Sequence, residues 1–297
     1  MGWSAEDIPD QSGRRIVVTG ANSGLGRVTA TELARHGAAV TLAVRDEAKG
    51  REAAAGMPGS VEVRRLDLAD LASVRAFAEA WEGTLDVLVD NAGVMLTPER
   101  RTKDGFELQF GTNHLGHFAL TNLLLPKLTD RVVVVSSAAH RMGRIDLDDP
   151  NWERRRYRSW GAYGQSKLAN LLFVWELQRR LDEAGSPLRA VAAHPGYAAT
   201  NLQTRMANPL ANGVSALATR LLAQSAADGA LPTLYAATQE LPGRTYIGPC
   251  GLMEQRGAPK VVGRAAAASD DGTARRLWEL SERLTGIEFP LASGAAA

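Results

Sequence analysis

Tyr163 and Lys167 are the residues of this 297-residue sequence whose types and spacing best suit chemistry. They are four residues apart in a stretch with a helical pattern, so both side chains lie on one face, a turn apart. A free tyrosine has a pKa of about 10, and a nearby ammonium lowers that pKa by favouring the phenolate. Ser137, at the end of a predicted strand, could hydrogen-bond a substrate oxygen. This set predicts proton transfer to or from an oxygen that a substrate carbon bears.

Two neighbouring residues compete for the same roles. Ser136 precedes Ser137, and alternation along a strand would point the two side chains in opposite directions. Tyr157 has no lysine four residues later, because Gly161 stands there. The pattern therefore disfavours Tyr157 as the acid, and it leaves the choice between the two serines open.

A glycine-rich turn, TGANSGLG at 19–26, joins the first predicted strand to a helix. Its glycines fit a tight turn, a close approach of backbone to a pyrophosphate and close packing of helix on strand. The N–H groups at the start of the helix attract phosphate, although an ordinary connecting loop could look the same. The residues expected to contact a dinucleotide here are Gly20, Asn22, Ser23, Gly24, Leu25 and Gly26.

Short apolar runs alternate with longer helical patterns as far as about residue 195. The predicted strands are 15–19, 39–44, 61–66, 85–89, 131–136, 188–194 and 245–249. The predicted helices are 24–36, 46–56, 70–82, 104–127, 161–184 and 270–285. Continuous Val/Leu runs suit strands that are buried on both faces of a parallel sheet. The sequence predicts one α/β domain over residues 1–297, a doubly wound Rossmann fold with about seven parallel strands and helices on both faces.

The alternating pattern breaks at 200–224, where a weakly amphipathic helical segment follows the sixth strand. Ligands of open α/β sheets bind beyond the carboxyl ends of the strands, so this segment could close over a site as a lid. A pair of packed surface helices explains the pattern equally well.

With these motifs the sequence resembles the short-chain dehydrogenase/reductase family over about residues 14–250. The motifs are TGANSGLG (19–26), DNAG (90–93), Asn113, Ser137, YGQSK (163–167) and HPG (194–196). The strings LAVRD, FGTNHLGHF and SSAAHR, with an insert at 138–160, are similar to the retinol-dehydrogenase-like branch. One departure is Asp90, which stands where many members have Asn.

The resemblance implies a role for each matching residue. Tyr163 would be the acid/base, Lys167 would tune its pKa and bind the nicotinamide ribose, and Ser137, the second of its pair, would position the substrate oxygen. Asn113 would organise a proton-relay water. The further expected cofactor contacts are Asp67 and Leu68 for the adenine, Asn91, Ala92 and Gly93 in the turn, and Pro195, Gly196 and Thr200 near the nicotinamide.

Arg45 indicates which nicotinamide cofactor is used. The second predicted strand ends in Val44, where an acidic residue would bind the ribose hydroxyls of NAD. The guanidinium of Arg45 instead fits a 2′-phosphate, and Asp46 is expected to cap the next helix. The sequence therefore predicts NADP(H), with NAD(H) as the less favoured cofactor.

Composition excludes several other classes of protein. A net charge of +1 excludes an ordinary nucleic-acid binder, and the basic run at 153–158 is read as a solvated face. His114 and His117 lack an acidic cluster and are expected to pack rather than to bind metal. His140 could line the opening for substrate. No apolar run reaches bilayer length and the N-terminus is polar, which predicts a cytoplasmic protein without an integral membrane segment.

Together these features predict an NADP(H)-dependent oxidoreductase that interconverts a carbonyl and an alcohol. The resemblance implies a lipophilic small-molecule substrate, and a homodimer or homotetramer formed through the helices that carry the Asn and Tyr–Lys motifs. The apolar stripe of Leu168, Leu171, Leu172 and Trp175 would suit such an interface or a monomer core. The alternatives are reduction of a C=C bond or an epimerisation on the same scaffold, and a non-catalytic protein that senses NADP or binds a partner.

Overall fold

The structure is a computed structural model that describes residues 2–196 and 225–291. Its centre is an eight-stranded sheet of order β3-β2-β1-β4-β5-β6-β7-β8, in which β8 is antiparallel to β7 and all other neighbours are parallel. The strands are β1 (Arg15–Thr19), β2 (Ala39–Val44), β3 (Ser60–Arg65), β4 (Leu85–Asp90), β5 (Leu128–Val135), β6 (Arg189–Ala193), β7 (Tyr246–Pro249) and β8 (Pro259–Val261). The doubly wound α/β fold is confirmed, with seven parallel strands and one further antiparallel strand at the edge.

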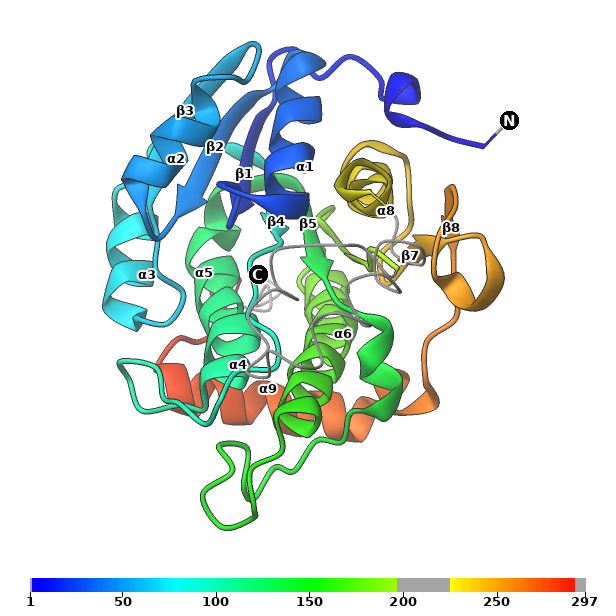
Figure 1. Ribbon diagram of the computed structural model, residues 1–297. Coiled ribbons are helices and arrows are strands. Elements are labelled where there is room, and N and C mark those ends of the chain that lie inside the picture. The colour runs from blue at the N-terminus through cyan, green and yellow to red at the C-terminus, as the bar shows by residue number, and fades with distance from the viewer. Residues whose placement is uncertain (1, 197–224, 292–297) are drawn as a thin grey trace, which may run out of the picture.

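The central strands lie where the apolar runs predicted them. In β1 the four residues after Arg15 are buried, and Ile16 pairs in register with Val40 of β2 and Val87 of β4. Such strands have no solvated face, because helices cover both sides of the sheet (Figure 1). β5 begins three residues earlier than expected and ends at Val135, just before the two serines.

The helices form a layer on each face of the sheet. One layer holds α1 (Gly24–Arg35), α2 (Glu47–Ala54) and α8 (Ala226–Thr238), and the other holds α3 (Leu71–Glu79), α5 (Gly116–Leu124) and α6 (Ser159–Glu183). Asp46 caps α2 as expected, because its carboxylate accepts the Lys49 N–H at 3.2 Å. Asp70 caps α3 in the same way.

The expected helix at 104–127 is shorter and irregular. It begins with the turn α4 (Leu108–Phe110), widens into a π-helical turn over Gly111–Leu115, and continues as α5 to Leu124. The N–H of Gly116 bonds the carbonyl of Gly111, five residues back. Turns of this kind are frequent at functional sites, and Asn113 lies inside this one.

Among the described residues, one α-helix and one strand were not predicted. α8 carries Gly229 and Pro232, residues that usually argue against a helix, yet Ser225 caps it by accepting the Asp228 N–H at 3.1 Å. β8 has only three residues and pairs with β7. The candidate lid at 200–224 lies outside the described residues.

The C-terminal helix α9 (Asp271–Thr285) covers the outer side of α5 and α6. The Trp278 ring stacks on Phe173 of α6 at 5.6 Å between centroids and meets Phe118 of α5 edge-on at 4.9 Å. Leu168, Leu171 and Leu172 are buried in the same cluster. This part of the apolar stripe is therefore core within the chain.

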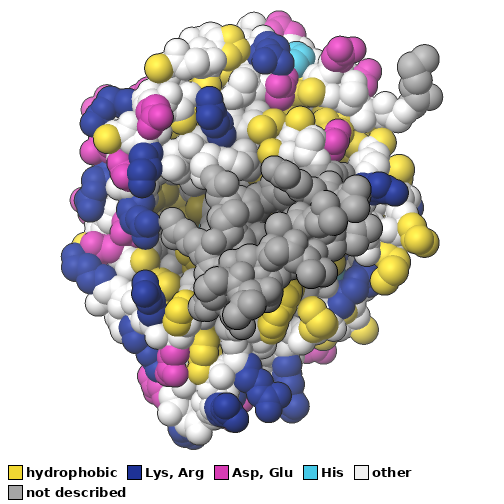
Figure 2. All heavy atoms as spheres, viewed as in Figure 1, with side chains coloured by type: hydrophobic (Ala, Val, Ile, Leu, Met, Phe, Trp, Pro, Cys, Tyr) yellow, Lys and Arg dark blue, Asp and Glu magenta, His cyan; other side chains and the backbone are white. Residues whose placement is uncertain are grey.

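Charged side chains of both signs are interspersed on the visible face of the molecule (Figure 2). Within the basic run, Arg155 stacks on Trp152 at 3.7 Å and lies 3.5 Å from the Asp149 carboxylate. This Arg is therefore engaged by its own loop. None of the helices in the described part of the chain is long and apolar enough to cross a membrane.

Candidate active site

The expected site residues gather at the carboxyl ends of β1, β4 and β5. The order of the sheet reverses between β1 and β4. The chain runs from β1 outward to β2 and β3, and then returns to place β4 on the other side of β1. Such a reversal leaves a crevice beyond the strand ends, where α/β sheets bind their ligands. Thr19, Asp90 and Val135 end the three strands, and the motifs start directly after them.

The glycine turn after β1 has the conformation that glycine allows. Gly20 has a φ of +67° and Gly24 of +55°, values that side chains disfavour. A Cβ on Gly20 would lie 2.9 Å from that of Ala92, and one on Gly26 would lie 2.4 Å from Asn91 Nδ2. Ser23, although it stands at the N-cap of α1, makes no side-chain cap bond. The first N–H groups of α1 are thus left for an anion, which fits the pyrophosphate of a dinucleotide.

The turn after β4 is tied to the end of β1. The Thr19 hydroxyl accepts the N–H groups of Asn91 and Ala92, each at 2.9 Å. In return, the Asn91 amide donates to the Thr19 carbonyl at 2.8 Å. Gly93 comes next, and a Cβ there would lie 3.2 Å from Asn113 Oδ1 and 3.6 Å from Lys167 Nζ. The two cofactor turns therefore contact each other, and the second also reaches the predicted catalytic residues.

Tyr163 and Lys167 are both buried on α6, with exposed fractions of 9% and 4%. Lys167 Nζ lies 5.8 Å from the centre of the Tyr163 ring and donates to the Val135 carbonyl at 3.0 Å. Asn170 donates to the same carbonyl at 3.1 Å. The end of β5 thus holds the lysine in place under the tyrosine ring.

The pKa values of the pair are shifted mainly by burial. Burial raises the pKa of Tyr163, while its hydrogen bond with Ser137 acts in the opposite direction. Burial lowers the pKa of Lys167 to about 8. Lys167 was expected to lower the pKa of Tyr163, but in the protein alone that pKa is raised. The ammonium of Lys167 faces the tyrosine ring and the Val135 carbonyl.

The two alternatives considered from the sequence have other partners. Ser136 is buried and donates to the Lys167 carbonyl at 2.8 Å, whereas the Ser137 hydroxyl accepts the Ala139 N–H at 3.2 Å and acts to lower the pKa of Tyr163. The Tyr157 hydroxyl donates to the Thr97 carbonyl and lies 3.1 Å from Glu107, and burial raises its pKa to about 12. Both act as structural links.

Asn113 is fully buried, and its side chain is committed to neighbouring groups. Its Oδ1 accepts the Val94 N–H at 2.7 Å, and its Nδ2 donates to the Val94 carbonyl and to the Ser166 hydroxyl. The side chain therefore fixes the segment after Gly93 to α6. The backbone carbonyl of Asn113 accepts from His117 Nδ1 at 3.0 Å.

The other expected cofactor residues surround the same edge of the sheet. Arg45 is exposed and has no hydrogen-bond or ion-pair partner in the described part of the chain. Asp67 accepts the Ala69 N–H at 3.0 Å, and Leu68 is buried against Gly116 of α5. Pro195 and Gly196 follow β6, and Gly196 has a φ of +65°. Thr200 lies outside the described residues.

The structure gives His140 a packing position rather than one at an opening. It is 1% exposed, its Nδ1 lies 2.7 Å from the Ser137 carbonyl, and its Nε2 accepts the Ala265 N–H at 3.2 Å. Its ring meets Tyr246 edge-on at 5.6 Å. The suggestion that it lines the substrate opening was therefore wrong.

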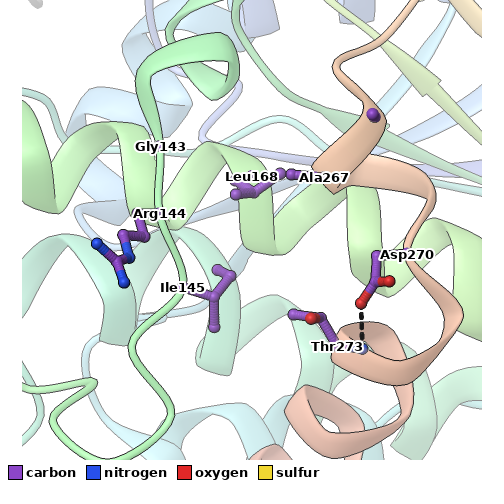
Figure 3. A pocket seen from close by; sticks show the side chains of 8 residues that line it. Gly143, Arg144, Ile145, Leu168, Ala267, Asp270 and Thr273 are labelled. Carbon is purple, nitrogen blue, oxygen red and sulfur yellow. Dashed lines mark hydrogen bonds between the residues drawn. The ribbon is translucent and has the colours of Figure 1, made fainter.

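A cavity of about 420 Å³ lies away from Tyr163, between the segment after Met142 and α9 (Figure 3). Leu168 and Asp270 are among the residues that line it, and the Asp270 carboxylate accepts the Thr273 N–H at 2.6 Å. Asp270 therefore serves as the cap of α9, and the cavity shares no side chain with the Tyr163 site.

Sequence reasoning missed a group of polar residues beneath the site. His117 lies 2.9 Å from the Thr19 hydroxyl, and Asp90, fully buried, accepts from Thr121 at 2.8 Å. Burial lowers the pKa of His117 to about 4 and raises that of Asp90 well above its usual value. The i, i+4 spacing of Asn113 and His117 was the available signal.

Comparison with known proteins agrees with this geometry. The sequence model described as short chain dehydrogenase matches residues 14–210. Human retinol dehydrogenase 13 is 43% identical over 94% of this chain and 86% of its own length. A crystal structure of an uncharacterised protein from Mycobacterium paratuberculosis is 58% identical, covers 98% of this chain and 100% of its own, and has a TM-score of 0.87. A short chain dehydrogenase from Shigella flexneri, solved with NADP, is 25% identical over 81% of this chain and 98% of its own, with a TM-score of 0.61. The chain belongs to the short-chain dehydrogenase/reductase family of oxidoreductases, in its retinol-dehydrogenase-like branch.

Proposed function

We propose that this protein is an NADP(H)-dependent oxidoreductase that interconverts a carbonyl and an alcohol on a lipophilic substrate, with Tyr163 as acid/base. The observation that carries the proposal is the position of Tyr163, which is buried with half-buried Ser137 near its hydroxyl and with Lys167 beneath the ring, 3.6 Å from the Gly93 Cβ position. Two hydroxyls at one point suit a substrate oxygen on which charge develops.

Members of this family use a nicotinamide dinucleotide, which supplies or accepts the hydride when it is bound. The glycine turn and the N-terminus of α1 would hold its pyrophosphate, and Arg45 would bind the 2′-phosphate of NADP. Lys167 has three N–H donors and spends one on Val135, so two remain for the ribose hydroxyls. The Shigella relative solved with NADP supports the choice of cofactor.

In the direction of reduction, Tyr163 donates its hydroxyl proton to the substrate oxygen while Ser137 hydrogen-bonds the same oxygen. The raised pKa of Tyr163 keeps it protonated at neutral pH, which suits an acid. In the direction of oxidation the phenolate must form first, so the rate of oxidation should increase as the pH rises. Asn113 would organise the water that returns the proton through Lys167.

The lipophilic substrate is supported by relatives named retinol dehydrogenases. We place the selection of the substrate in two segments, 138–160 and 197–224, which follow Ser137 and Gly196 directly in the sequence. The cytoplasmic location, the single domain over 1–297 and a homodimer or homotetramer stay predictions.

The test is turnover of retinal and a panel of aldehydes and ketones with NADPH and with NADH, followed by identification of the product. An alcohol product with NADPH preferred supports the proposal. A saturated carbonyl, or an epimer, would instead favour one of the alternative reactions. Tight binding of NADPH without turnover of any substrate would favour a non-catalytic role.

A further inference from the structure

Two histidines three residues apart on the same helical segment have different surroundings. His114 and His117 are each 1% exposed, and burial lowers the pKa of both, to about 3 and about 4. His114 faces α9, where its Nε2 lies 2.9 Å from the Ser281 hydroxyl. His117 faces the strand ends. His114 therefore has a packing position, and His117 lies beneath the site.

The partners of His117 determine which ring nitrogen carries the proton. A carbonyl can only accept, so the contact at 3.0 Å between Nδ1 and the Asn113 carbonyl requires a proton on Nδ1. The Thr19 hydroxyl already accepts two N–H groups, from Asn91 and Ala92, so it has no lone pair left for a third and can only donate. Its proton lies between Nε2 at 2.9 Å and the Val89 carbonyl at 3.3 Å, and Nε2 is the nearer acceptor. Both contacts assign the same neutral tautomer.

The charged and titratable groups around His117 are consistent with a neutral ring. Lys167, on the side of α6, disfavours a positive charge on His117. Asp90 Oδ1 lies 3.9 Å from Nε2, too far for a hydrogen bond. The imidazole therefore acts as a fixed link between Thr19 and Asn113.

We propose that His117 is a positioning residue, which holds the backbone carbonyl of Asn113 in place and ties it to Thr19, the first residue of the glycine-rich turn. The π-helical turn at 111–115 breaks the regular bonding of the backbone around Asn113, and the His117 side chain supplies a bond to its carbonyl. The consequence for catalysis rests on the proposed function, in which Asn113 serves proton relay. His117 itself touches neither substrate nor cofactor.

Substitution can separate the two bonds. Asn at position 117 reaches about as far as Nδ1 and keeps a donor for the Asn113 carbonyl, whereas Gln reaches as far as Nε2 and keeps a partner for Thr19. We expect His117→Leu to lower kcat by up to about 100-fold, the loss that a displacement of about 1 Å can cause, with an unchanged KM for the carbonyl. His117→Asn should recover most of kcat, and His117→Gln should not.

His114→Leu is the matched control, because it removes a buried neutral imidazole from the same segment. It should lower the melting temperature and leave kcat unchanged. Wild-type kcat in His117→Leu, equal loss of kcat in the two leucine variants, or recovery by Gln rather than Asn would each overturn the proposal.

A second measurement needs no turnover. Long-range ¹H–¹⁵N correlation spectra of the cofactor-free protein should show Nδ1–H for His117. They should show Nε2–H for His114, because the Ser281 hydroxyl donates to the Leu277 carbonyl and so accepts from the ring. A His117 ring protonated at Nε2 would overturn the proposal. Absence of carbonyl turnover together with the expected tautomers would reject the proposed function and leave the His117 geometry standing.

Discussion

Helices α5 and α6 have two sides that differ in kind. The side toward the strand ends buries Tyr163, Lys167 and His117, whose pKa values are displaced by burial. The side toward α9 buries Phe118 and Phe173, which contact Trp278 through their rings. The named side chains on both sides are buried. Burial on the first side changes proton affinity, and burial on the second provides packing energy.

The difference implies that stability and chemistry can be altered separately on the same two helices. A change on the α9 side should affect unfolding with little effect on turnover. A change at the strand ends should affect turnover, cofactor choice or the pH dependence of stability, and leave the aromatic cluster intact.

The largest effect on stability is expected for Trp278→Ala. Trp278 is 2% exposed, and removal of a buried Trp costs about 3–5 kcal/mol of unfolding free energy. Denaturant unfolding measures the loss, and kcat at a temperature where the variant is folded should match the wild type. Trp160→Ala, at a side chain that is 56% exposed, is the control and should unfold like the wild type. A stable Trp278→Ala protein would show that α9 is not part of the core.

Arg45→Ala tests the strand-end side through cofactor choice. A hydrogen bond to a charged group contributes about 1.5–3 kcal/mol, so the dissociation constant for NADPH should rise by roughly 10-fold or more while that for NADH stays unchanged. Calorimetric titration measures both constants. Arg51→Ala removes the same charge from α2, where Arg51 lies 3.8 Å from Glu47, and should change neither. Equal effects of the two variants would reject Arg45 as the phosphate contact.

Asp90→Asn tests the pH dependence of stability. The folded pKa of Asp90 is raised, so at a pH between the unfolded and the folded pKa the folded protein holds a proton that the unfolded chain has released. This group therefore makes the wild type lose about 1.4 kcal/mol of stability per pH unit, between the unfolded and the folded pKa. The Asn variant lacks that term, so its melting temperature relative to the wild type should increase as the pH rises from the unfolded pKa of Asp towards the raised folded pKa. An advantage that does not change with pH would mean that Asp90 is ionised in the fold.

The sequence predicted the central strands closely, because runs such as VVVV at 132–135 suit only a strand buried on both faces. The sequence also predicted that Tyr163, Lys167, Ser137 and Asn113 lie at one edge of the sheet. Each follows a predicted strand or lies on a predicted helix, in the order of the family's motifs. It could not show that α9 covers α5 and α6, because contacts distant in the chain leave no periodic signal. The widened turn around Asn113 and the bonds of His117 depend on side-chain geometry that spacing alone does not fix.

The central claim is that Tyr163 transfers the proton, and kcat for carbonyl reduction by Tyr163→Phe tests it most directly, beside Tyr157→Phe. General acid catalysis contributes about 10²- to 10⁴-fold, so Tyr163→Phe should lose that much and retain cofactor binding. Tyr157→Phe, whose hydroxyl bonds Thr97 and Glu107, should keep its kcat and lose some stability. Full turnover by Tyr163→Phe would contradict the account.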